Sequence, residues 1–278
     1  MNLTELRTFL AIVENGSLAR ASAQLNVTQS TVTARLQSLE AELGQRLLNR
    51  QKSGVTLTGP GERFRKYADT ISDLWRQARQ ETALPGPTEA VCNIGSHPDL
   101  WPGLGAMVFT DLQDTQPNLA LSAWHGGQHD LAYWLATGLI DLALTYWPVE
   151  TKGCDTLELP MDKLVLVSSE PNAPARNDPG YVLAEHGQAF TREHAAAYSD
   201  AGTARISFGS SELALSHVLT QGGSAYLPAR LVAQHLATGQ LHRVPKAPTF
   251  ERQPYLLVRR SAQKDWPWYT GVLQRLMD

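Results

Sequence analysis

The N-terminal part of the chain alternates between apolar and polar positions in the pattern of three short helices. Apolar side chains recur every three or four positions over residues 3–13, and Gly16 is the residue type that commonly ends a helix. Residues 17–25 and 28–43 fit two further helices, each of which begins at a Ser or Thr suited to N-capping. Gly44 is expected to end the third helix.

The third predicted helix, which contains "VTQSTVTARL", has two different faces. Its apolar stripe, expected to face the domain interior, consists of Val32, Leu36, Leu39 and Leu43. The opposite side is small and polar: Ser30, Thr33, Ala34, Gln37 and Ser38, flanked by Thr31 and Arg35. Base edges in the major groove of DNA offer matching donors, acceptors and methyl groups. A helix, a tight turn and such a second helix predict a DNA-binding helix-turn-helix.

Two further elements follow this helix. The segment "NRQKSGVTLTG" alternates around Gly54 and predicts a small hairpin whose Arg50 and Lys52 can reach a flanking phosphate backbone. Residues 60–84 form a long helix with a repeat typical of a two-helix coiled coil: Phe64, Tyr67, Ile71, Leu74 and Ala78. We expect a dimer seam, and the alternative is an amphipathic helix packed on its own domain. "LPGPTE" then reads as a linker.

From Val91 onward, strand and helix patterns alternate. Strands are predicted over residues 91–95, 119–124, 140–146, 163–168, 181–185, 204–209, 224–228, 241–244 and 255–258. Helices are predicted over residues 129–138, 212–223 and 229–239, and "EPNAPARNDPG" marks a surface loop or a boundary. This alternation predicts an α/β fold with parallel sheets, in which ligands bind beyond the carboxyl ends of the strands.

Composition restricts the class of protein. At 278 residues and 42% hydrophobic content, the chain is that of an ordinary globular protein with more than one domain. We expect a cytoplasmic protein, because the sequence has neither a membrane-spanning apolar run nor a signal-peptide pattern. Cys92 and Cys154 are isolated and are expected to be buried thiols. Residues 17–66 carry a net charge of +5 and the rest −8, so the basic segment is the one suited to a polyanion.

No motif favours an enzyme. "FGSSE" lacks the Gly-x-Ser-x-Gly pattern of a nucleophile elbow, and no phosphate-binding glycine loop follows a strand. His125 and His129 have a metal-ligand spacing, but two glycines separate them and no Cys or Glu completes a site. We therefore expect no catalytic residues, no metal and no cofactor.

The N-terminal motifs resemble a known family. "LRTFLAIVENGSLARASAQLNVTQSTVTARLQSLEAELGQRLLNRQKSGVTLTGPGERF" is similar to the winged helix-turn-helix of the LysR-type transcriptional regulators. It includes "TQSTVT" at the start of the recognition helix and "LE-x-x-LG" at its end. Leu48, where the family usually has Phe, and the proline of "LTGPG" depart from the common pattern. The resemblance continues more weakly to the end of the chain.

The resemblance implies a domain organisation and roles for particular residues. Residues 1–58 would form the DNA-binding domain and 59–86 a dimerising linker helix. Residues 91–278 would form an effector domain like the periplasmic binding proteins, with one subdomain of 91–160 plus about 246–278 and another of about 161–245. The expected DNA contacts are Gln29, Ser30, Thr31, Thr33, Arg35 and Arg50, to which the hairpin adds Lys52.

The effector would lie between the subdomains, at strand ends that carry Ser96, His97, Trp124, His125, Trp147, Ser210 and Ser211. Tyr146, Glu185 and His186 follow strands in the same way, and no Lys or Arg is expected in this cleft. The expected ligand is apolar or aromatic, with one anionic group held by the helix end at Ser96. The alternative is that Trp124 and Trp147 belong to the core.

The sequence thus predicts a LysR-like DNA-binding transcriptional regulator under the control of a small-molecule effector. Its expected partners are double-stranded DNA, further copies of the chain in a homodimer or homotetramer, and RNA polymerase as a candidate, with no membrane. The alternative is a small-molecule sensor protein whose DNA-binding role is secondary. The two differ in whether DNA affinity falls steeply with salt.

Overall fold

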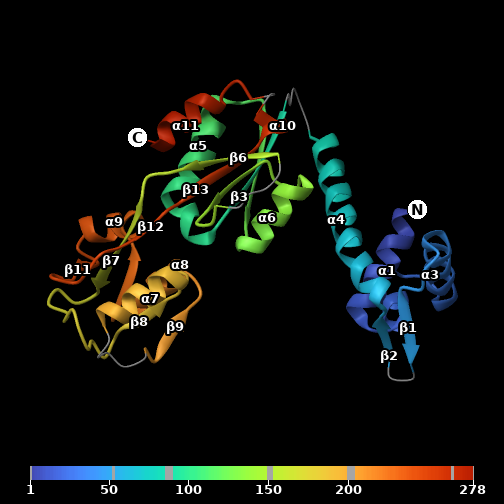
Figure 1. Ribbon diagram of the computed structural model, residues 1–278, viewed down its shortest axis with the longest axis horizontal. Helices are drawn as coiled ribbons and strands as arrows, with labels where there is room; N and C mark the ends of the chain where they lie inside the picture. The colour runs from blue at the N-terminus through green and yellow to red at the C-terminus, as the bar shows by residue number, and fades with distance from the viewer. Residues whose placement is uncertain are drawn as a thin grey trace. The chain divides into compact units, whose positions relative to one another are not determined.

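The computed structural model describes residues 2–51, 54–84, 90–148, 153–198, 204–263 and 266–277 (Figure 1). The chain divides into two compact units, Met1–Leu84 and Pro85–Asp278. Within the described ranges, no helix has the length and apolar character needed to cross a bilayer.

The first unit contains the three predicted helices, a two-stranded hairpin and a long helix: α1 (Leu3–Asn15), α2 (Leu18–Gln24), α3 (Gln29–Leu43), β1 (Leu48–Gln51), β2 (Gly54–Leu57) and α4 (Gly59–Thr82). Caps explain where the helices begin and end. Ser17 and Thr28 accept hydrogen bonds from the first turns of α2 and α3, and Gly16 and Gly44 adopt left-handed conformations after α1 and α3. Asn26, in the turn before α3, has a φ of 53°, which Asn tolerates better than most residues.

The apolar faces of these helices form one core. Val32, Leu36 and Leu39 of α3 are buried against Leu6, Phe9 and Ile12 of α1 in the same cluster. The predicted stripe is therefore confirmed for its first three members. The prediction of burial is wrong for Leu43, which is 40% exposed because α3 ends there and the chain turns at Gly44.

Hydrogen bonds from three backbone N–H groups attach the hairpin to this core. The Val55 N–H donates to the Gly16 carbonyl over 2.9 Å, which joins β2 to the end of α1. The Glu40 carboxylate accepts from the N–H groups of Leu47 and Leu48 at 2.7 and 3.2 Å, which fixes the start of β1. These contacts give the hairpin a defined position beside α3.

Helix α4 differs from the predicted coiled-coil seam. Phe64 packs edge-on against Phe9 at 5.4 Å between ring centroids, and Ile71 packs on the same core beside the fully buried Ala68. The seam assignment is therefore wrong for Phe64 and Ile71, which belong to the core of their own unit. An exposed apolar stripe remains on the helix, formed by Tyr67, Leu74, Trp75 and Ala78.

The second unit begins with a lobe built on a five-stranded sheet, which we call the first lobe (residues 90–160 and 254–277). Its strands, in sheet order, are β4 (Leu119–His125), β3 (Ala90–Ser96), β5 (Leu142–Thr145), β13 (Tyr255–Arg259) and β6 (Cys154–Glu158). Its helices are α5 (Ala106–Thr115), α6 (Gln128–Thr137), α10 (Arg260–Gln263) and α11 (Tyr269–Met277), with a 3-10 turn at Pro98–Leu100.

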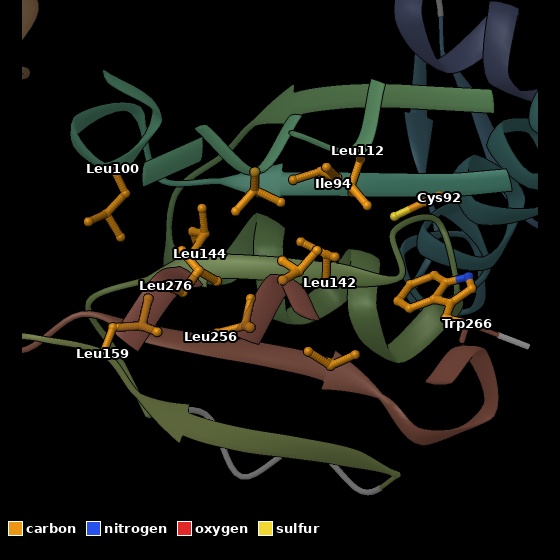
Figure 2. Close-up of a cluster of buried hydrophobic side chains, with 13 residues drawn as sticks. Cys92, Ile94, Leu100, Leu112, Leu142, Leu144, Leu159, Leu256, Trp266 and Leu276 are labelled. Carbon is orange, nitrogen blue, oxygen red and sulfur yellow. The ribbon is translucent and has the colours of Figure 1, made fainter. Parts of the chain in front are cut away.

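Strand alternation places helices on both faces of this sheet. Ile94, Leu142, Leu144 and Leu256 point into one layer, which α5 and α11 cover (Figure 2). Leu257 packs with Leu131 and Leu135 of α6 in a separate cluster, and α6 covers the other face of the sheet (Figure 1). Both cysteines are buried free thiols, as predicted.

The second lobe (residues 161–253) has its own sheet. β7 (Asp162–Ser168) pairs with β10 (Ser224–Pro228) on one side and with β11 (His242–Arg243) and β12 (Phe250–Arg252) on the other. β8 (Val182–Ala184) and β9 (Ile206–Phe208) form a parallel pair. Its helices are α7 (Gln188–Ala197), α8 (Ser211–Gln221) and α9 (Ala229–Ala237).

The prediction of parallel sheets is correct only in part. β3 pairs in parallel with β4 and β5, but every partner of β7 is antiparallel, as are both partners of β13. The alternation of strands and helices does not show whether neighbouring strands run parallel or antiparallel. Here their directions depend on the chain crossing between the lobes and returning. β6 and β12 were not predicted. Because β12 pairs with β7, the return to the first lobe follows Arg252, later than the expected position near residue 246.

Candidate functional site

The N-terminus of α3 is organised by Thr28. Its hydroxyl accepts from the Thr31 N–H at 3.2 Å and lies 2.8 Å from the hydroxyls of both Ser30 and Thr31. Thr28 is thus the cap of the helix, and the hydroxyls of Ser30 and Thr31 are held in place by it. An N-terminus presented in this way points its backbone N–H groups outward, where they suit a phosphate.

The longer side chains of this face are free to reach a ligand. Gln29 is exposed and Arg35 is half-buried, and neither forms a hydrogen bond or ion pair with another residue of the described chain. Thr33 is half-buried between them on the helix surface. Arg50 is exposed on β1, opposite Val55. Lys52 lies outside the described residues.

A second constellation joins the two lobes of the other unit, and its centre is Asp99, which is fully buried. One carboxylate oxygen accepts from the Ser211 N–H at 2.9 Å, and the other accepts from Arg252 at 3.2 Å. His186 Nδ1 lies 3.6 Å from that second oxygen, and its Nε2 donates to the Tyr226 carbonyl at 2.8 Å. Burial alone would raise the pKa of Asp99, but His186, Arg252 and the Ser211 N–H together hold it well below its usual range.

Asp162 is the second carboxylate of this network. It accepts from the Tyr146 hydroxyl at 2.5 Å and from Arg230 and Arg252 at 3.0 and 3.4 Å. The Arg252 guanidinium also lies over the Tyr146 ring, 3.9 Å from its centroid. Arg230 donates to the backbone carbonyls of the first lobe at Asp99 and Pro102. We call these residues the inter-lobe network: Asp99, Tyr146, Asp162, His186, Ser211, Arg230 and Arg252.

The prediction that this region has no Lys or Arg is wrong. Arg252 comes from β12, which was not predicted, whereas Arg230 is the second residue of α9 and directly follows the predicted strand of residues 224–228. Asp99, three residues after β3 ends, and Asp162, the first residue of β7, were not named either. The available signal was the pair of carboxylates beside buried strands, since a buried charge requires an opposite charge nearby.

The predicted effector residues separate into two groups. His97 lies with Tyr146 and Trp147, each 5.3 Å away between ring centroids, and Ser211 contacts Asp99 in the network. Ser210 caps α8. Trp124 is 42% exposed and packs against Trp134, while His125 packs against Trp101, so neither is brought to the network.

The hydrogen-bonding groups of the expected anion site at Ser96 are already paired within the protein. The Ser96 hydroxyl is fully buried and donates to the His97 carbonyl at 2.9 Å. The helical turn that follows has only three residues, and His97 Nδ1 caps it by accepting from the Asp99 N–H. This segment is therefore saturated by its own residues.

We expect His97 to make stability dependent on pH. Burial lowers its pKa from 6.5 to about 4, with Asp99 acting in the opposite direction. The folded state thus favours the neutral ring, so its contribution is complete above about pH 6.5 and is lost as the pH falls toward 4, by up to about 3 kcal/mol. Urea unfolding at several pH values should show this loss. His97→Asn keeps an acceptor for the Asp99 N–H but does not titrate, so it should flatten the dependence of stability on pH. Identical pH profiles for the variant and the wild type would contradict the role of His97.

The chain matches family models over most of its length. Residues 3–62 match the model described as bacterial regulatory helix-turn-helix protein, lysR family. Residues 86–265 match the LysR substrate binding domain. The chain belongs to the LysR family. It is accordingly a DNA-binding transcriptional regulator with an effector-binding domain.

Individual LysR-type relatives align over almost the whole chain. The HTH-type transcriptional regulator YofA of Bacillus subtilis is 28% identical over 100% of this chain and 98% of its own length. HdfR of Escherichia coli is 27% identical over 95% and 94%. Among solved structures, CbnR has a TM-score of 0.73 at 18% identity with full coverage of both chains. CbnR complexed with its target DNA has the same TM-score at 19% identity, covering 99% of each chain.

Proposed function

We propose that this chain reads a roughly palindromic site in double-stranded DNA through the exposed face of α3. Gln29, Thr33 and Arg35 would contact base edges and phosphates in the major groove, and Ser30 and Thr31 would support the helix end beside the backbone. Arg50 and Lys52 would contact flanking phosphates from the hairpin. The observation that carries the proposal is the exposed N-terminal half of α3, which has long unpaired side chains and no carboxylate.

Salt dependence tests this proposal against the sensor alternative. A gel-shift titration with a duplex that the protein selects should show affinity falling about a hundredfold or more between ~50 and ~200 mM salt, because phosphate contacts release counterions. A flat response, or binding too weak to measure at low salt, would favour a sensor whose DNA-binding role is secondary.

We further propose that α4 joins two copies of the chain. The exposed apolar side chains of Tyr67, Leu74, Trp75 and Ala78 lie along the helix, and a second copy supplies an identical set for an isologous contact. A homodimer formed in this way, or a homotetramer built from two, would present two α3 helices to two half-sites.

Leu74→Glu is expected to weaken dimerisation by about tenfold or more, because it places a charge in an apolar seam. Sedimentation velocity over a concentration series measures the effect. Leu74→Met, which conserves side-chain volume, should leave the dimer intact. Equal dimerisation of the Glu variant and the wild type would move the interface away from α4.

The effector is proposed to bind between the lobes, beside the inter-lobe network, with His97, Trp147 and Ser211 as its contacts. Ser96 and Ser210 would shape this region through the backbone. Trp124 and His125 are not part of this proposal, because they pack against Trp134 and Trp101 instead.

A protein that acts on chromosomal DNA works in the cytoplasm, and we propose a regulatory and not an enzymatic role.

A further inference from the structure

The second lobe contains a cavity of about 330 Å³ that lies apart from the inter-lobe network. One wall is the sheet, with Leu166 of β7 and Tyr226 of β10, and another is the end of α7. The loop from Pro174 to Pro179, which the sequence marks by its Pro and Asn content, closes it. A volume of this size is in the range of pockets that hold one small molecule.

Four aromatic side chains line the cavity: Tyr181, His194, Tyr198 and Tyr226. Tyr181 and His194 are stacked, with centroids 5.6 Å apart and planes at 12°. Their polar atoms are paired with one another, since the Tyr181 hydroxyl lies 3.0 Å from His194 Nε2. Burial raises the pKa of Tyr181 and lowers that of His194, so this wall is uncharged at neutral pH. Neutral, stacked rings favour a flat aromatic ligand.

The hydroxyl groups of Tyr198 and Tyr226, whose rings lie beside His194, leave one hydrogen-bond acceptor unused. Tyr226 donates its only proton to the Pro248 carbonyl at 3.1 Å, so the 2.6 Å contact with Tyr198 requires the Tyr198 hydroxyl to be the donor. The Tyr198 oxygen can then accept a hydrogen bond. Burial likewise raises the pKa of Tyr226, which keeps this pair neutral.

The charges at the cavity favour an anion. Asp178 is the carboxylate among the lining residues, and both its oxygens are occupied, by the Gly180 N–H at 2.8 Å and the Ser224 hydroxyl at 2.5 Å. The positive charges among the lining residues are the guanidinium groups of Arg176, which lies over the Tyr198 ring at 5.3 Å from its centroid, and Arg205. Arg176 donates to the Ala197 carbonyl, whereas Arg205 is exposed and has no hydrogen bond or ion pair to any residue in the described ranges.

We propose that this cavity is a second small-molecule site, which takes a planar aromatic compound with one anionic group. The ring lies against Tyr181 and Tyr198, and the anion faces Arg205 at the opening. Tyr226 connects the site to the inter-lobe network, since its ring lines the cavity while its carbonyl holds His186 beside Asp99. An occupant therefore contacts the residue that positions part of the network. This inference does not depend on the proposed DNA contacts.

Calorimetric titration of the full chain with benzoate, without DNA, tests the site. Benzoate should bind saturably, and benzamide, its uncharged analogue, should bind at least about tenfold more weakly. Arg205→Gln should reduce benzoate affinity about tenfold, the loss typical of one hydrogen bond between charged groups. Arg192→Gln, the same change at an exposed position of the same lobe outside the cavity lining, should have no effect.

Three results would overturn the proposal. These are no saturable binding up to the solubility of benzoate, equal binding of benzamide, and benzoate binding that Arg205→Gln leaves unchanged. The last result would place the probe elsewhere, including between the lobes. Because Arg205 is exposed, its replacement is not expected to impair folding, and an unchanged melting temperature of the Arg205→Gln variant would verify this.

Discussion

Replacing Arg252 with Met is expected to lower the free energy of unfolding of the second unit by about 3–5 kcal/mol, the typical cost of removing one partner from a buried ion pair. The side chain is 7% exposed and contacts both Asp99 and Asp162. Its removal leaves two buried carboxylates with fewer compensating charges, and it also removes the cation from the face of Tyr146. Urea unfolding followed by circular dichroism measures the change.

The matched control is Arg260→Met. Arg260 contacts Asp155 at 2.6 Å, but their side chains are 63% and 42% exposed. An exposed pair of this kind contributes little to stability, because water screens its charges. A loss for Arg252→Met no larger than that of the control would mean that the inter-lobe network does not hold the lobes together.

Arg35→Ala is expected to weaken DNA binding by about 1–3 kcal/mol without changing the melting temperature. Arg35 has no partner in the described chain, so its removal leaves no group of the protein unpaired. Fluorescence anisotropy with a selected duplex measures the affinity. Arg192→Ala makes the same change on the exposed surface of the second lobe and should leave the affinity unaltered. If both variants bind as the wild type does, Arg35 is not a DNA contact.

The parts of the fold that depend on local chemistry were predicted well. Capping by Ser17 and Thr28 and helix ends at Gly16 and Gly44 involve residues a few positions apart, so the three helices follow directly from the sequence. The exposed face of α3 follows from the same periodicity. Leu43 shows the limit, since the wheel assumes that the helix continues and has no information about where the chain turns.

The parts that depend on distant residues were not predictable in the same way. The apolar repeat of α4 is the same whether the helix forms a dimer seam or packs on α1. Phe64 and Ile71 lie in the core of their own unit because of tertiary contacts that the repeat does not show. Asp99 and Arg252 are 153 positions apart, and no spacing rule connects them. The direction of strands beside β7 depends on how the chain crosses between lobes, to which the alternation of strands and helices is insensitive.

The central claim is that α3 reads DNA sequence, and selection of bound duplexes from a random library tests it most directly. The full-length wild type should enrich a sequence with dyad symmetry, because two α3 helices in a symmetric dimer contact equivalent half-sites. Gln29→Ala should still enrich the same symmetric spacing but lose preference at one position of each half-site. Enrichment of no sequence by the wild type, or an identical consensus for wild type, Gln29→Ala and Arg35→Ala, would contradict the account.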